Sequence, residues 1–131
     1  MEEKIKDIYK CKSLDGNDSL VIWHNQVIEK KAEELTIADV ARCIRQNLFT
    51  EIAYEVLLAY LLNNPYAGDL YEGELMDKAS EVDKELISKH KSTIQEIIEK
   101  ANTFIKTYEW LCEEDKIEFT DSVNELKEKI V

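Results

Sequence analysis

The sequence contains few residues that interrupt helices, with one proline and three glycines among 131 residues. Cysteine and histidine are also scarce, at three and two residues, and no Cys-x-x-Cys pair occurs. Isolated cysteines in an odd number are typical of reduced thiols in the cytoplasm and argue against a disulfide framework. The longest apolar run, Val56–Leu62, is too short to cross a bilayer, and the charged start of the chain lacks the apolar core of a signal peptide. We therefore predict a cytoplasmic protein without a membrane-spanning segment.

Basic residues are fewer than acidic ones. The chain has 17 Lys and Arg and 28 Asp and Glu, which gives a formal net charge of −11. This charge argues against nucleic acids and anionic membranes as partners, since both would repel the surface. It favours a basic protein partner, or it serves solubility alone. The length suits a single domain over residues 1–131, which can bury roughly two-thirds of its unfolded surface and needs no metal or disulfide for stability.

Apolar residues recur at steps of three and four along most of the chain, which is the spacing of amphipathic helices. We predict an all-α fold, a single compact bundle of about six to eight helices. Thr36 and Asp39 have the spacing of a capping box at the start of one helix, and Thr120 or Asp121 suits the start of the last one. A short strand is the alternative at Leu20–Trp23, but helical steps follow it and we predict a helix. The predicted apolar stripes span residues 37–48, 49–62, 75–87, 94–112 and 119–130.

Motifs of catalysis and metal binding are absent from the sequence. Asp15, Asn17 and Ser19 resemble the front of a calcium loop, but Leu20 and Gln26 replace the glycine and glutamate that such a loop needs further on. Neither histidine has a second histidine or a cysteine within one helical turn, and no phosphate-binding glycine loop occurs. We expect a non-enzymatic protein with no cofactor, no metal site and no catalytic residue.

Acidic residues gather in two segments of the second half of the chain. Residues 69–85 carry seven acids and two lysines, and residues 109–125 carry seven acids and one lysine. Part of this charge suits helix N-termini, where the helix dipole favours acids. The remainder predicts an acidic surface that can face a basic partner.

The segment 63–77 holds the only proline and two of the three glycines. We predict that the preceding helix ends at Asn63–Pro65, since the residue before a proline leaves the helical region. Gly68 then supplies a turn with positive φ, and Asp69 or Glu72 opens the next helix. A rigid loop of this kind, bearing tyrosines and acids, suits contact with a basic protein.

Two stretches together resemble a bacterial protein family. They are LTIADVARCIRQNLF at residues 35–49 and NPYAGDLYEGELM at residues 64–76, separated by an apolar helix of suitable length. This combination is similar to the immunity proteins of contact-dependent growth inhibition (CDI) systems, and the resemblance covers residues 20–85. Met76 stands where the family pattern has leucine. The matching residues are Leu35, Thr36, Asp39, Val40, Arg42, Arg45, Gln46, Asn47, Phe49, Asn64, Pro65, Ala67, Gly68, Tyr71, Gly73, Glu74 and Leu75.

The resemblance implies a small cytosolic protein that binds the toxic C-terminal domain of a large exoprotein and blocks it. Such toxins are commonly nucleases, often acting on tRNA. In a subset of these systems the toxin also recruits a host enzyme of cysteine biosynthesis as an activator, which would give a ternary complex. The matching residues also suit structural roles, because Arg42 and Arg45 share one helix face and could pair with Glu74 or Asp69 to lock the loop.

A nuclease holds a polyanion in a basic cleft, so an acidic protein can occupy that cleft and exclude the substrate. We expect toxin binding on residues 69–81 and on a second patch at residues 113–115. Two alternatives stay open: a helical adaptor or antitoxin-like regulator of another basic protein, and a small enzyme that uses carboxylates. The enzyme alternative predicts a concave pocket with converging acids of shifted pKa. The expected contact residues are Asp69, Tyr71, Glu72, Glu74, Asp77, Glu81, Glu113, Glu114 and Asp115.

Overall fold

The computed structural model describes residues 3–131, and within them it contains eight α-helices, one short 3₁₀ helix and no strand. The predicted all-α fold is confirmed, and residues 20–23 are helical as predicted. None of the helices in this range is long and apolar enough to span a membrane. The elements are α1 (Ile5–Tyr9), α2 (Ser19–Val27), η1 (Ala32–Glu34), α3 (Ile37–Gln46), α4 (Thr50–Asn63), α5 (Glu74–Glu81), α6 (Lys84–Lys89), α7 (Lys91–Phe104) and α8 (Glu113–Lys129).

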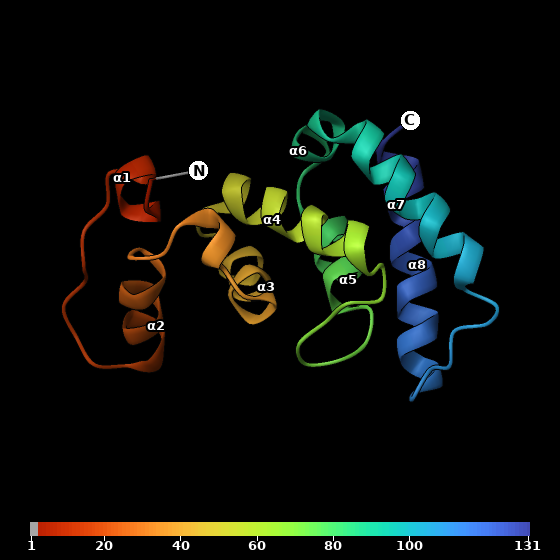
Figure 1. Ribbon diagram of the computed structural model, residues 1–131, viewed down its shortest axis with the longest axis horizontal. Helices are drawn as coiled ribbons and strands as arrows, with labels where there is room; N and C mark the ends of the chain where they lie inside the picture. Colours follow the sequence, from red (N-terminus) through yellow and green to blue (C-terminus); the bar gives the residue numbers. More distant parts are fainter. Residues whose placement is uncertain (1–2) are drawn as a thin grey trace.

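The helices are distributed along the long axis of the molecule (Figure 1). α1 and α2 lie at one end, α3 and α4 lie in the middle, and α7 and α8 lie at the other end. α4 has a central position because it packs against η1, α3, α5 and α7. This position agrees with the apolar residues that surround its second half. A cluster of buried apolar side chains runs from Ile5 in α1 to Ile130 at the end of α8.

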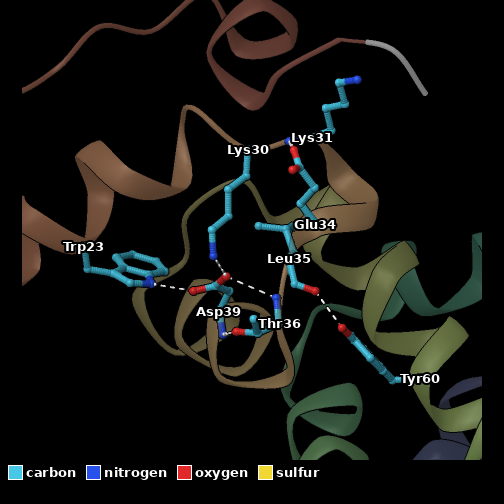
Figure 2. Close-up of polar contacts among 8 residues, drawn as sticks. All are labelled: Trp23, Lys30, Lys31, Glu34, Leu35, Thr36, Asp39 and Tyr60. Carbon is cyan, nitrogen blue, oxygen red and sulfur yellow. Dashed lines mark hydrogen bonds and ion pairs between the residues drawn. The ribbon is translucent and has the colours of Figure 1, made fainter.

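A buried carboxylate organises the first half of the chain (Figure 2). Asp39 accepts hydrogen bonds from the indole Nε1 of Trp23 at 3.1 Å and from Nζ of Lys30 at 2.6 Å. It also accepts one from the backbone N–H of Thr36, whose hydroxyl accepts one from the Asp39 N–H, so the predicted capping box is confirmed. Burial alone would raise the pKa of Asp39, but the bonds from Lys30, Thr36 and Trp23 outweigh burial and hold this pKa below its usual value.

Two tyrosine hydroxyls of α4 satisfy carbonyl groups of neighbouring segments. The Tyr60 hydroxyl donates to the carbonyl oxygen of Leu35 at 2.6 Å, just before α3 (Figure 2). The buried Tyr54 hydroxyl donates to the carbonyl oxygen of Ala79 at 2.9 Å. That carbonyl lies in the last turn of α5, where it has no partner within its own helix. These bonds fix both α3 and α5 to the central helix.

The predicted helical stripe over residues 94–112 is wrong beyond residue 104. α7 ends at Phe104, and the next residues form an irregular segment that leads to α8. In this segment Tyr108 and Trp110 pack against the core without continuing the helix. These apolar residues keep helical spacing in the sequence, but they reach the core from an irregular segment rather than from a helix. As a result Leu111, which the stripe places on an apolar helix face, is 91% exposed.

Two other helix boundaries also differ from the prediction. α8 begins at Glu113 rather than at Thr120 or Asp121, and its first turn is acidic, as the helix dipole favours. The stripe over residues 75–87 is divided between α5 and α6. The division occurs because the Asp83 side chain accepts a hydrogen bond from the Leu86 N–H at 2.9 Å and starts a new helix.

The loop between α4 and α5 follows the predicted path, but its glycines have other roles than predicted. Asn64 is extended before the proline, with φ −150°, as predicted. Gly73 has a positive φ of +83°, whereas Gly68, for which positive φ was predicted, does not. Gly68 is needed for space, because a Cβ at this position would collide with the carbonyl oxygen of Tyr71.

Candidate functional site

Glu74 opens α5, rather than Asp69 or Glu72 as predicted, and its carboxylate holds the preceding loop. The residue is only 1% exposed. Its Oε1 accepts hydrogen bonds from the backbone N–H groups of Asp69 at 2.7 Å and of Leu70 at 3.1 Å. Hydrogen bonds to a buried carboxylate are strong and fix the backbone that donates them. Glu74 therefore positions the loop, and the side chain of Asp69 lies exposed on it.

The arginines of α3 do not lock this loop. The prediction that Arg42 and Arg45 pair with Glu74 or Asp69 is wrong, because residues 3–131 contain no such ion pair. The guanidinium of Arg42 lies over the Trp23 ring instead, 4.8 Å from the ring centroid, which is the geometry of a cation–π contact. Two backbone N–H groups already bind Oε1 of Glu74, so the loop is held without an arginine.

Asp77 in α5 is buried between two hydroxyl groups. Its Oδ2 accepts a hydrogen bond from the Tyr71 hydroxyl at 2.8 Å, and its Oδ1 accepts one from the Ser122 hydroxyl of α8 at 2.6 Å. Burial raises the pKa of Asp77; the two hydroxyl bonds offset part of this increase, and the charges of Glu118 and Glu81 add to it. The pKa of Tyr71 is raised as well, by burial and then by its contact with Asp77.

A shallow acidic cleft of about 300 Å³, the α5–α8 cleft, lies open to solvent between α5 and α8. Two of its carboxylates, Glu81 and Glu125, have a lysine Nζ at 3.4 Å, from Lys78 and Lys129 on the same helices. Its other acids have no ion pair within the part of the chain that the structure describes. The α5–α8 cleft therefore carries negative charge that the protein does not neutralise. It is lined by Tyr71, Asp77, Ser80, Glu81, Glu118, Asp121, Ser122 and Glu125.

A second concave region of about 460 Å³, the loop hollow, lies where the loop before α5 meets the start of α8. It contains side chains from both predicted acidic patches, which are far apart in the sequence. The structure therefore brings the two patches together at one place. Its acids and tyrosines comprise Asp69, Tyr71, Glu72, Tyr66 and Asp115.

The predicted contact residues differ in their exposure. Glu113 and Glu114 are exposed in the first turn of α8, beside Asp115. Among the others, Asp69 and Glu81 are exposed, Tyr71, Glu72 and Asp115 are half-buried, and Glu74 and Asp77 are buried.

Sequence reasoning missed Glu118 and Asp121, which line the α5–α8 cleft together with Glu125. The signal was present, because acids at positions i, i+3 and i+7 share one helix face. It was not used because the helix was predicted to start only at residue 120 or 121. No group of histidine, cysteine and acidic side chains suited to a metal ion occurs among residues 3–131.

Comparison with known protein families bears on the identity of the chain. A sequence model of the family described as CDI immunity proteins matches residues 5–97, which is more than half of the chain. The match ends within α7, so α8 and its acids lie outside the matched range. None of the curated proteins matches the chain.

Proposed function

We propose that this chain, which belongs to the family of CDI immunity proteins, neutralises the C-terminal toxin domain of its cognate exoprotein by binding it through the acidic surface formed by α5, α8 and the loop before α5. The family supports toxin neutralisation as the function. The kind of toxin is what the family resemblance implies, and the mode of binding is inferred from the charge of the surface. We infer that the toxin is a nuclease, with tRNA as the candidate substrate, and that binding takes place in the cytoplasm.

The observation that carries this mechanism is the lack of neutralising partners for the acids of one surface. Among residues 3–131, only Glu81 and Glu125 of the five acids in the α5–α8 cleft have a lysine within ion-pair distance. The loop hollow adds further acids and has no lysine or arginine among the side chains that line it. A nuclease must present a basic cleft to hold its substrate, and such a cleft would be attracted to this surface.

An acidic surface also accounts for the speed that immunity requires. Complementary charge can raise the association rate of two proteins to about 10⁸–10⁹ M⁻¹s⁻¹ at low salt. A toxin entering the cell would then be captured before it meets many substrate molecules. Once bound, the carboxylates would occupy the place of the substrate phosphates and exclude the nucleic acid.

Co-expression tests the proposed function directly. The C-terminal fragment of the exoprotein encoded next to this gene is induced with and without this chain. We expect the fragment alone to stop growth, and the chain to restore growth and to co-purify with the fragment. A host enzyme that co-purifies in addition would identify the ternary complex. Failure of the chain to restore growth or to bind the fragment would contradict the proposed function.

One observation favours an alternative function. The enzyme hypothesis predicts a concave pocket with converging acids of shifted pKa, and the α5–α8 cleft brings acids together around one of them, Asp77, whose pKa is raised. However, both oxygens of the Asp77 carboxylate are engaged by hydroxyls, which suits a structural role. An adaptor for another basic protein would use the same surface, and it would bind its partner without restoring growth in the presence of the toxin.

A further inference from the structure

Two exposed leucines border the loop hollow. Leu70, in the loop before α5, is 71% exposed, and Leu111, in the segment before α8, is 91% exposed. Both side chains line the same hollow, although they come from segments that are far apart in the sequence. A single exposed leucine is ordinary on a protein surface. Two exposed leucines that line one concavity place apolar surface where a partner could cover it.

Leu70 is held in a defined position. Its backbone N–H donates to the buried carboxylate of Glu74 at 3.1 Å, and the neighbouring N–H of Asp69 donates to the same oxygen. The loop is closed further by the Gly73 N–H, which donates to the carbonyl oxygen of Tyr66 at 2.9 Å. The loop therefore presents Leu70 without needing to become ordered on binding, which favours affinity.

Leu111 follows directly after an aromatic cluster that anchors its segment. The Tyr66 ring stacks on Tyr108 with centroids 4.1 Å apart, and Trp110 packs edge-on against Tyr66 at 5.6 Å. Trp110 also contacts Phe119 of α8 at 5.3 Å. The Tyr66 hydroxyl donates to the carbonyl oxygen of Ala101 at 2.7 Å, which attaches the cluster to α7. The same cluster thus supports both leucine-bearing segments, since Tyr66 belongs to the loop before α5.

The chemistry around the two leucines defines the partner. The acids in the loop hollow are Asp69, Glu72 and Asp115, and none of its lining side chains is a lysine or arginine. Its apolar wall includes Ile37 and Ala67. A concavity lined by both apolar and acidic side chains fits a basic protein surface from which an apolar side chain projects.

We propose that Leu70 and Leu111 form the apolar centre of the surface with which this chain binds its toxin, and that the exposed Asp69, together with the half-buried Glu72 and Asp115, supplies the charge around it. This inference rests on the proposed function and adds to it the residues that sustain binding. Interfaces commonly owe most of their affinity to a few desolvated central side chains, while exposed charges at the rim act mainly on association. The acids would attract the toxin, and the two leucines would retain it.

The test is a kinetic comparison of the full chain with the double variant Leu70→Ala/Leu111→Ala, binding the purified toxin fragment in a surface or stopped-flow assay. We expect at least tenfold faster dissociation of the double variant, with association at low salt unchanged within about twofold because no charge is altered. The matched control is Leu14→Ala, which removes a leucine that is 52% exposed in the loop between α1 and α2. We expect wild-type dissociation for this control.

The outcomes separate this inference from the proposed function. If the wild-type chain binds the toxin and restores growth but the double variant dissociates within twofold of the wild-type rate, the apolar centre lies elsewhere and the inference is overturned. If the wild-type chain neither binds nor protects, the proposed function fails and the inference fails with it. Both leucines are exposed, so we expect the thermal midpoint of the double variant to stay close to wild type, and this measurement excludes unfolding as the cause of faster dissociation.

Discussion

Two buried aspartates show how differently the two halves of this molecule use negative charge. Asp39, in the α2–α4 half, is bonded to a lysine, an indole N–H and a backbone N–H, and its pKa is lowered. Asp77, in the α5–α8 half, is bonded to two neutral hydroxyls and faces other carboxylates, and its pKa is raised. The first carboxylate is compensated within the fold, and the second is not.

The difference indicates what each half contributes. A carboxylate that is compensated by a cation and several donors joins elements together, as Asp39 joins α2 to the start of α3. Carboxylates without a cation repel one another and reduce stability, but their charge remains available to a partner. The acidic surface of α5 and α8 therefore fits recognition, whereas the Asp39 network fits stability. Substitutions in each half should therefore separate the effect of acids on stability from their effect on toxin binding. Three variants test this separation, and they follow in order of their expected effect on stability.

The largest loss of stability is expected for Asp39→Ala. The change leaves the Trp23 indole N–H and the Lys30 ammonium group without their partner and removes the capping box. We expect the free energy of unfolding to fall by about 3 kcal/mol. Urea denaturation at neutral pH measures this free energy. The control is Asp15→Ala at an exposed position, and we expect its free energy of unfolding to lie within about 0.5 kcal/mol of wild type. A loss below about 1 kcal/mol at Asp39 would show that the network does not stabilise the fold.

A smaller effect, of opposite sign, is expected for Asp77→Asn. Because the folded-state pKa of Asp77 is raised, the folded chain binds this proton more tightly, and wild-type stability falls as pH rises through the raised value. The asparagine cannot ionise, so the variant should match wild type near pH 4 and exceed it by up to about 1 kcal/mol near pH 7. The lowered pKa of Asp39 gives the opposite slope, because its contribution is lost as pH falls through that lowered value.

Urea denaturation at several pH values checks this prediction, and the growth assay is run on the same variant. We expect Asp77→Asn to retain protection against the toxin, since the remaining acids of the surface are unchanged. A variant that is stable at pH 7 but no longer protects would favour the enzyme alternative. If Asp77→Asn is instead less stable than wild type near pH 7, the Asp77 carboxylate does not destabilise the fold.

The smallest effect on stability, and a clear effect on binding, is expected for Asp69→Lys/Glu114→Lys. Both side chains are exposed, so the free energy of unfolding should change by less than about 1 kcal/mol. This figure includes the cost of replacing Glu114, an acid in the first turn of α8, with a lysine. Association with the toxin fragment at low salt should slow by about tenfold, with a weaker salt dependence. The control Asp7→Lys/Asp15→Lys makes the same charge change at the other end of the molecule. Equal slowing by both variants would mean that only net charge matters and that the acidic surface has no specific role.

Local signals in the sequence predicted much of the fold. The capping box of Thr36 and Asp39 and the extended Asn64 before proline depend on residues within one helical turn, and both predictions are confirmed. The segment after Phe104 was mispredicted because its apolar residues keep helical spacing, while Tyr108 and Trp110 reach the core without a helix. Spacing alone does not distinguish these two ways of burying the same side chains. The exposure of Leu111 followed from that difference and was not predictable.

The sequence by itself determined that this protein is helical, strongly acidic and similar to a known family, because helix propensity, charge and short motifs depend on residues that are close together in the chain. Only the tertiary structure decided which acids serve the fold and which remain uncompensated. Glu74 and Asp77 are three residues apart on one helix, but Glu74 meets two backbone N–H groups and Asp77 meets a serine hydroxyl from α8. The partners of a carboxylate come from distant segments, and their arrival within hydrogen-bond distance depends on the packing of the whole chain.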